Sequence, residues 1–503
     1  MNASDAKATP SRMSVRGAAV WAMAGQYIGF AIQFASSVII SRLFLAPGEV
    51  GLFSIALAAA LLVAILQDFG LSRYISGLRE IDQGEVRRCS SVALLFSLLV
   101  VGVIWALAWP LAHLYHLPEL APLLVIIGSS YLFLPLAVVP MALLAREMRF
   151  DRHFGINVGG AAAQAGVAIG LGALGYSSFA LAWATVAAGL ARGLIAQVMH
   201  PALPWPPRLD GLRKVIGFGT RSSVLYLTGA LGTRTPDLIL GKLVTLTSVG
   251  LYSRAASLSD QFRTLISGAI GSVFFPAFAR MRDRGEDLGP PYLRVCAGYS
   301  AVVWPGMAGL ALAAEPIVRL LYGENWMGVA PLLTMISLAE ILLVSLPLVS
   351  DMPILLGRMN RLLAYNVADT LLSLALLGLG AWWGGVEGAA ASRLIYAAGW
   401  LAIYAGFMHH LVKFDIRGLF AIYARSTVAT LAAIAPLALV YACWAGPAII
   451  GFAPLLLAVA LGALCWFAAL AVLRHPALAE ILGMASALPP LRPLAARLRA
   501  MTS

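Results

Sequence analysis

Apolar runs long enough to cross a lipid bilayer recur along this chain from residue 17 to about residue 473, separated by short polar breaks. A helix needs about 20 consecutive apolar residues to cross the hydrocarbon layer, which offers no water to hydrogen-bond the backbone. Hydrophobic residues make up 60% of the sequence and charged residues 12%, whereas about one quarter of an average soluble domain is charged. We therefore expect an all-α polytopic membrane protein with no separate soluble domain.

Fourteen of these runs are bounded by Gly, Pro or charged residues, and each is predicted to form one transmembrane helix. The first run, Gly17 to Leu45, is longer than the hydrophobic region of about 7 to 15 residues in a signal peptide, so we expect it to be retained. The predicted helices are residues 17–45, 48–72, 89–113, 120–145, 155–175, 178–198, 218–243, 247–279, 295–321, 327–356, 363–383, 386–410, 426–445 and 449–473.

The connections between these helices alternate in their content of Lys and Arg. Residues 73–88 ("RYISGLREIDQGEVRR") and 280–294 ("RMRDRGEDLGPPYLR") are rich in Arg, whereas "LAPGE", "LVTLT" and "YGENW" contain no basic residue. Basic loops face the cytoplasm, so both termini are predicted to be cytoplasmic, which requires an even number of spans. The net charge of +12 then reflects topology and contact with membrane lipids. No nucleic-acid partner is expected, because the basic tails lack the interleaved aromatic residues that such binding favours.

A short internal repeat divides the chain. Residues 45–56 ("LAPGEVGLFSIA") match residues 244–255 ("VTLTSVGLYSRA") in VGL, an aromatic residue and Ser. The match predicts two pseudo-symmetric six-helix lobes followed by two further helices; chance similarity between apolar sequences is the alternative. The predicted segments are a tail (1–16), an N-lobe (17–198), a linker (199–217), a C-lobe (218–410), helices 13 and 14 (411–473) and a C-terminal tail (474–503).

Charged residues inside the predicted spans indicate a site, because a central charge costs about 2.5 to 3.5 kcal/mol in lipid. Arg254 has no acidic residue within one helical turn, and Ser257 and Gln261 share its helix face. Arg254 is therefore the favoured residue for binding an anionic ligand. Asp260 and Arg263, like Arg234 and Asp237, are spaced i, i+3 and could instead form local salt bridges. Long side chains near helix ends can reach the interface, which is our interpretation of Arg42, Arg192, Arg221, Lys242 and Arg319.

Polar side chains in two predicted helices suit a sugar phosphate. Tyr226 lies among several hydroxyl residues in the seventh helix, and Gln26 and Gln33 lie in the first. Amides and hydroxyls pair with sugar hydroxyls, and guanidinium groups match phosphate oxygens; hydrogen bonding between helices is the alternative role. The candidate substrate-binding residues are Gln26, Gln33, Tyr226, Arg234, Arg254, Ser257, Gln261 and Arg263.

Carboxylates in the spans are candidates for coupling transport to H⁺ or Na⁺, because an isolated carboxylate in lipid can exchange a proton or bind a cation. Glu340 lies nearest the middle of its span and is favoured, with Asp68 and Asp369 as further candidates. Asp68 lies near a cytoplasmic helix end, where capping or pairing with Arg73 is the alternative. We expect no cofactor, no metal site and no catalytic residues, because no nucleotide-binding or catalytic motif stands out and the extracytoplasmic loops are short.

Several stretches resemble the polysaccharide transporter family of the MOP flippase superfamily over roughly residues 14–410. They are "GAAVWAMAGQYIGFAIQFASSVIISRLFLAPGEVGLFSIA", "LQDFGLSRYI", "LGKLVTLTSVGLYSRAASLSDQF" and "VFFPAFARM", with "VGLYSRA" (residues 249–255) the most specific. The resemblance implies that an undecaprenyl-diphosphate-linked oligosaccharide is flipped across the bacterial cytoplasmic membrane for lipopolysaccharide, capsule or exopolysaccharide assembly. It also implies two lobes in a V working by alternating access, and a polysaccharide polymerase and chain-length machinery as partners.

Two alternatives remain at this point. A cation-coupled multidrug antiporter of the MATE type belongs to the same superfamily, but such proteins usually have twelve spans and acidic cavities, whereas the first helix here carries no carboxylate. A membrane-embedded glycan transferase or ligase would act on the same lipid carrier. The short extracytoplasmic loops favour transport over catalysis, so we expect the protein not to be an enzyme.

Overall fold

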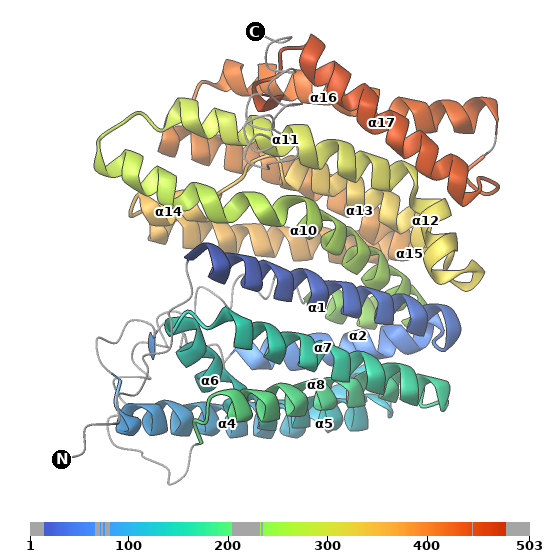
Figure 1. The fold of residues 1–503 in the computed structure, drawn as a ribbon. Coiled ribbons are helices and arrows are strands. Elements are labelled where there is room, and N and C mark those ends of the chain that lie inside the picture. The colour runs from blue at the N-terminus through green and yellow to red at the C-terminus, as the bar shows by residue number, and fades with distance from the viewer. Residues whose placement is uncertain are drawn as a thin grey trace. The chain divides into compact units, whose positions relative to one another are not determined.

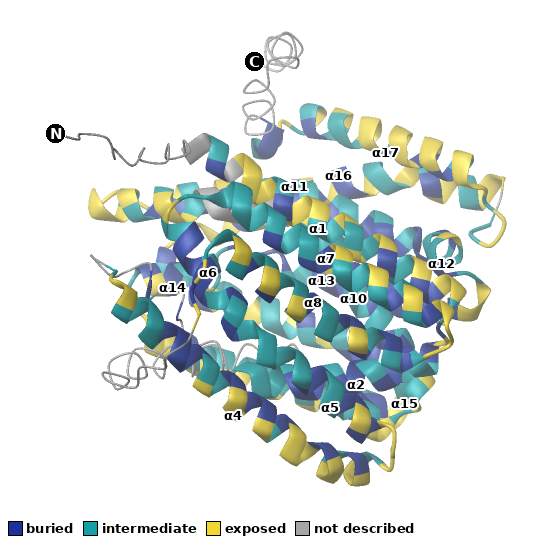
Figure 2. Ribbon diagram, turned by 60° about the horizontal axis from the view of Figure 1, so that its bottom comes forward, coloured by how far each residue is buried: buried dark blue, intermediate teal, exposed yellow. Residues whose placement is uncertain are grey.

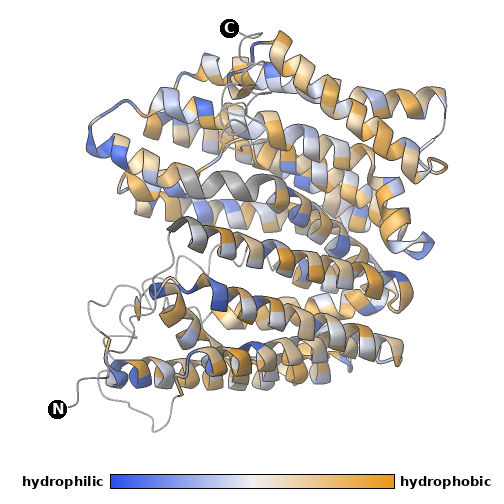
Figure 3. Cartoon of the chain, viewed as in Figure 1, coloured by the Kyte–Doolittle hydropathy of each residue, from blue (hydrophilic) through white to orange (hydrophobic). Residues whose placement is uncertain are grey.

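The computed structural model describes residues 15–65, 71, 74–75, 81–203, 232, 235–444 and 446–478. Every described secondary-structure element is a helix, and no strand occurs within these residues. Ten helices in this part of the chain are long and apolar enough to cross a membrane, and hydrophobic positions, drawn in orange, recur along them in Figure 3. The predicted all-α, multi-pass architecture is confirmed.

The chain divides into two compact units, residues 1–250 and 251–503. In the first unit α7 packs between α1 and α8 (Figure 1). The predicted span 120–145 is one membrane crossing in which α5 and α6 are joined by a short 3₁₀ turn. The elements are α1 (Val15–Leu43), α2 (Pro47–Ala64), α4 (Gln83–Tyr115), α5 (Leu120–Ser130), η2 (Tyr131–Phe133), α6 (Leu134–Arg146), α7 (Phe150–Ala173) and α8 (Ser178–Met199).

The second unit contains all but the first turn of α10, and in it α11 packs against α13 and α16. Its elements are α10 (Leu246–Asp283), α11 (Gly289–Leu312), α12 (Ala314–Tyr322), η3 (Glu324–Trp326), α13 (Val329–Leu343), α14 (Asp351–Leu355), α15 (Met359–Val412), α16 (Ile416–Cys443) and α17 (Phe452–Val472). The predicted helix 218–243 is described only at residue 232 and from residue 235 onward. The lobe limits that the sequence suggests stay predictions.

The 54-residue helix α15 is a hairpin of two spans. A straight helix of that length would extend about 80 Å, far more than a bilayer. Gly384 and Gly385 leave the helical conformation, and Gly385 has a φ of 58°, which glycine adopts without strain. Beyond the break the halves touch, since a Cβ on Gly388 would lie 2.1 Å from the carbonyl oxygen of Gly380. The two halves match the predicted helices 363–383 and 386–410.

The repeated VGL sequence has a structural counterpart within the first unit. Gly51 lies in the first turns of α2, and Gly250 lies in the first turns of α10. A Cβ on Gly51 would lie 2.0 Å from the carbonyl oxygen of Leu246, and one on Gly250 would lie 1.8 Å from that of Pro47. The two equivalent glycines therefore let the two helix starts pack backbone against backbone.

The last two helices attach to α11 through a buried polar chain. The Ser300 and Ser426 hydroxyls are 2.8 Å apart, and His475 Nε2 lies 3.0 Å from the Ser426 hydroxyl. Trp466 Nε1 also donates to the carbonyl of Ala301 at 2.8 Å. The outer face of α17 is largely exposed and apolar (Figure 2), as expected of a helix bordering lipid.

Candidate functional site

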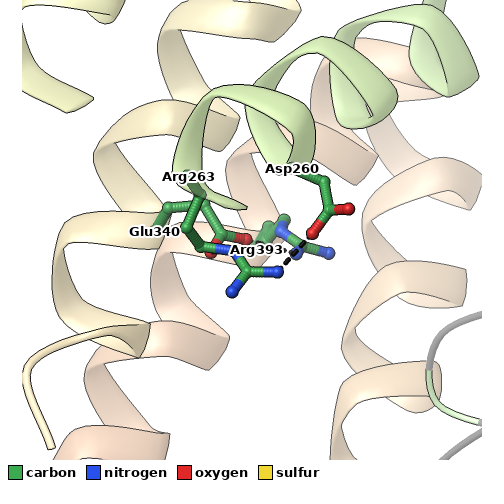
Figure 4. Close-up of polar contacts among 4 residues, drawn as sticks. All are labelled: Asp260, Arg263, Glu340 and Arg393. Carbon is green, nitrogen blue, oxygen red and sulfur yellow. Dashed lines mark hydrogen bonds and ion pairs between the residues drawn. The ribbon is translucent and has the colours of Figure 1, made fainter. Parts of the chain in front are cut away.

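Four charged side chains from three helices meet in the second unit (Figure 4). Glu340 on α13 accepts a hydrogen bond from Arg393 Nη2 on α15 at 2.7 Å. Its other carboxylate oxygen lies 3.3 Å from Arg263 Nε on α10. Arg263 also pairs with Asp260, one turn earlier on the same helix. The cluster of Asp260, Arg263, Glu340 and Arg393 thus ties α10, α13 and α15 together.

Burial differs strongly across this charged cluster. The Glu340 side chain is 10% exposed, whereas the Asp260 side chain is 64% exposed. The two arginines lie between these extremes. Two carboxylates and two guanidinium groups cancel in formal charge, which lowers the cost of placing them inside a membrane. The cluster has a buried end, Glu340 with Arg393, and an accessible end, Arg263 with Asp260.

This geometry changes the expectation for Glu340. We predicted an isolated carboxylate, but Glu340 is held by two guanidinium groups from different helices. The predicted i, i+3 pair of Asp260 and Arg263 does form, but it is not self-contained, because Arg263 also contacts Glu340. An ion-coupling role for Glu340 stays a prediction, and any such role would require breaking these contacts.

Asp369 lies in a different polar setting on the α15 hairpin. Its carboxylate accepts a hydrogen bond from the Tyr396 hydroxyl at 3.1 Å. Two turns further along the hairpin, Tyr404 donates to the side-chain oxygen of Asn366 at 3.0 Å. These bonds cross from one half of the hairpin to the other, and within the described residues no arginine pairs with the Asp369 carboxylate. Asp369 is thus less constrained than Glu340.

Arg254 lies against two aromatic rings. Its guanidinium carbon is 5.5 Å from the centroid of Tyr322 and 5.4 Å from that of Trp326, a geometry that favours cation–π attraction. Both rings are almost completely buried. Of its predicted companions, Gln261 donates to the Ser257 hydroxyl at 3.2 Å within α10. Contact of Arg254 with an anionic ligand stays a prediction.

The remaining predicted residues are not part of the charged cluster. Gln26 and Gln33 are on α1 and line a cavity in the first unit. Arg234, Tyr226 and Asp68 lie outside the described residues. Within the described chain, no group of three or more His, Cys, Asp or Glu side chains could hold a metal ion.

Sequence reasoning missed the role of Arg393. It is 53 residues from Glu340 in the sequence, and no short-range spacing connects them. The available signal was that a buried carboxylate in a membrane needs a cationic partner, and Arg393 lies within the predicted span 386–410.

Comparison with known proteins shows that the sequence is similar to proteins of polysaccharide biosynthesis and transport. The profile of the family described as polysaccharide biosynthesis proteins matches residues 39–331, more than half of the chain. The chain is 25% identical over 340 residues to the succinoglycan biosynthesis transport protein ExoT of Rhizobium meliloti (strain 1021), covering 64% of this chain and 65% of the relative. It is 21% identical over 349 residues to the lipopolysaccharide biosynthesis protein WzxC of Escherichia coli (strain K12), covering 68% and 70%.

Among solved structures, the fold is similar to the lipid II flippase MurJ in an inward closed conformation. The TM-score is 0.72 at 12% sequence identity, and the match covers 90% of this chain and 98% of MurJ. At that identity the likeness concerns the fold alone, whereas the sequence profile spans the VGL repeat and both helices that begin with it. The chain therefore belongs to the family of polysaccharide biosynthesis proteins.

Proposed function

We propose that this protein flips an undecaprenyl-diphosphate-linked oligosaccharide across a membrane by alternating access, for lipopolysaccharide, capsule or exopolysaccharide assembly. The observation that carries the proposal is the family match over residues 39–331 in a chain whose described part is almost entirely helical and apolar. The relatives ExoT and WzxC are named for succinoglycan biosynthesis transport and lipopolysaccharide biosynthesis, respectively. The fold shared with a lipid flippase is compatible with a lipid-linked cargo.

The charged cluster suits the anionic part of such a cargo at its accessible end. Arg263 is partly exposed, and its partner Asp260 is more exposed still. A diphosphate oxygen can replace the Asp260 carboxylate on Arg263, because guanidinium binds phosphate and carboxylate with the same geometry. Glu340 and Arg393 then hold the three helices in place. Arg254 and the undescribed Arg234 are further proposed contacts for the diphosphate, and Tyr226 for the sugar.

The remaining features of the proposal concern location and partners. The protein resides in the bacterial cytoplasmic membrane with both termini in the cytoplasm, as the basic loops favour. It acts on its cargo without covalent chemistry and delivers it to a polysaccharide polymerase and chain-length machinery. Transport is coupled to H⁺ or Na⁺ through a carboxylate, for which Asp369 has the fewest competing contacts of the described candidates.

The experiment is a leaflet-accessibility assay in proteoliposomes carrying a fluorescent prenyl-diphosphate oligosaccharide. We expect native protein to move the lipid and Arg263→Gln to slow it at least tenfold, since charged hydrogen bonds contribute about 1.5–3 kcal/mol. Arg280→Gln is the matched control, because Arg280 is an exposed arginine on the same helix. Export of cationic dyes without lipid movement would indicate an antiporter, and a new covalent glycan product would indicate a transferase.

A further inference from the structure

The first compact unit contains a cavity of about 490 Å³ between α1 and α7, reached by one side chain of α8. Its walls combine a cation, amides and aromatic rings: Arg192, Gln26, Gln33, Asn157, Trp21 and Phe154. Trp21 and Phe154 meet edge to face with ring centroids 5.2 Å apart. A large apolar ring beside amide groups is the usual lining of a pocket for a small polar ligand with an apolar face, such as a sugar.

Arg192 is the unusual member of this cavity. Its Nε atom is buried without a hydrogen-bond partner, and its side chain makes no hydrogen bond or ion pair within the described part of the chain. This differs from our interpretation of Arg192 as a residue that reaches the membrane interface. A cation in a membrane span is costly unless water, a partner or a ligand stabilises it.

The chain makes room for Arg192 at one position. A Cβ on Gly160 would lie 2.3 Å from Arg192 Cγ and 2.6 Å from its Nε. Only glycine therefore lets the arginine of α8 run across α7 toward α1. By contrast, Gly166, on the same helix α7, has nothing within 4 Å of its Cβ position. The lack of a side chain at Gly160 therefore leaves space for the Arg192 side chain, whereas at Gly166 no neighbour needs that space.

The amides support the same conclusion. Gln26 and Gln33 are both exposed on α1, a span otherwise rich in apolar residues. Neither makes a hydrogen bond within the described residues, and the same holds for the Asn157 side chain on α7. Amide groups facing hydrocarbon would lose their hydrogen bonds with water, so this face of α1 borders a wet space or a ligand. Amides donate and accept, as sugar hydroxyls do.

We infer that this cavity is a binding site for an anionic saccharide, in which Arg192 holds the carboxylate or phosphate group and Gln26, Gln33 and Asn157 hold sugar hydroxyls. The inference rests on the proposed function only in taking that saccharide to be part of the lipid-linked cargo. The negative group has two sources, an acidic sugar of the glycan or the phosphate that joins the first sugar to the lipid. Both present oxygens that match the guanidinium group.

The test is calorimetric titration of the full-length protein in lipid nanodiscs with glucuronate, glucose 1-phosphate, glucose and inorganic phosphate. We expect at least one anionic sugar to bind at least tenfold more tightly than both glucose and phosphate. Tighter binding of glucuronate assigns the site to an acidic sugar, and tighter binding of glucose 1-phosphate assigns it to the sugar next to the lipid phosphate. Native protein that binds neither anionic sugar overturns the inference.

Variants separate a binding role of Arg192 from a structural one. Arg192→Gln and Gly160→Ala should each weaken binding of the anionic sugar at least tenfold. Arg192→Lys should weaken it less, and Gly166→Ala should leave the affinity unchanged. Arg192→Gln should leave the weak binding of glucose unchanged, whereas a general loss of folding would abolish it. Undiminished affinity in Arg192→Gln overturns the inference. If native proteoliposomes move no lipid-linked sugar, the proposed function fails, but the titration still decides this site.

Discussion

Arg393 and Arg192 are both arginines within apolar helices, one in each compact unit, but their surroundings are opposite. Arg393 donates to Glu340 at 2.7 Å in a cluster whose charges cancel. Arg192 makes no hydrogen bond or ion pair within the described residues and lines a cavity with amides and an exposed tryptophan. A charge satisfied inside the protein contributes to its structure, whereas an unsatisfied one is available to a ligand. The two sites should therefore respond differently to mutation.

The largest loss of stability is expected at Glu340, which pairs with two arginines inside the protein. Glu340→Ala removes the acceptor that Arg263 and Arg393 share, and breaking a buried ion pair from one side typically costs about 3–5 kcal/mol. The melting temperature in detergent, followed by intrinsic fluorescence, should fall sharply. Glu315→Ala is the control, because Glu315 pairs with Arg319 at a more exposed position. Equal melting temperatures for the two variants would refute the structural role of Glu340.

The double variant Glu340→Met, Arg393→Met should recover much of that loss. Replacing both members of a buried pair by apolar residues is often neutral or stabilising, because no charge is left without its partner. A double-mutant cycle on melting free energies should give a coupling of about 1–3 kcal/mol between the two positions. Additive effects of the single substitutions would mean that the contact between Glu340 and Arg393 contributes little to stability.

Arg192→Met should change the free energy of unfolding in the opposite direction from a substitution of Arg393. Because Arg192 lacks a partner in the described chain, its removal relieves a desolvation cost, and stability should stay unchanged or rise by up to about 1 kcal/mol. The measurement is the same melting experiment without added ligand. A loss of several kcal/mol would show that Arg192 is a structural residue and would remove the contrast with Arg393.

The smallest effect is expected at Asp260. Its side chain is 64% exposed, and its pair with Arg263 is spaced i, i+3 on one helix. Such pairs contribute about 0.2–0.5 kcal/mol, so Asp260→Asn should barely change the melting temperature. Because Arg263 would then lack its exposed competitor, binding of a prenyl diphosphate in nanodiscs should become stronger. Weaker binding in this variant would argue against exchange of Asp260 for the diphosphate.

Much of the fold could be predicted from the sequence because the hydrocarbon layer imposes helix length directly. The break between residues 383 and 386, for example, coincides with Gly384 and Gly385 in the structure. The candidate site was harder to predict, because it depends on contacts between distant helices. Glu340 meets Arg393 across 53 residues. The ring contacts of Arg254 likewise come from residues on α12 and η3.

Arg192 shows most clearly what could not be predicted from the sequence. Its position near a helix end suggested a side chain extending to the interface, and only the packing of α8 on α7 shows that it runs past Gly160 into a cavity. The sequence does contain the relevant residues, "GINVGG" at positions 155–160. Gly155 and Gly159 allow close helix packing, because a Cβ on either would lie within 3 Å of the Met199 or Ile195 side chain. The neighbouring Gly160 instead leaves space for the Arg192 side chain.

The most direct test is the initial rate at which native, Arg192→Gln and Gly166→Ala proteins move a fluorescent prenyl-diphosphate oligosaccharide between leaflets of proteoliposomes. We expect the native and Gly166→Ala proteins to translocate this lipid at similar rates. Arg192→Gln should be at least tenfold slower at low substrate concentration and should approach the native rate when substrate is in excess. Native protein that leaves the lipid in its original leaflet would show that the protein is not a flippase for this cargo.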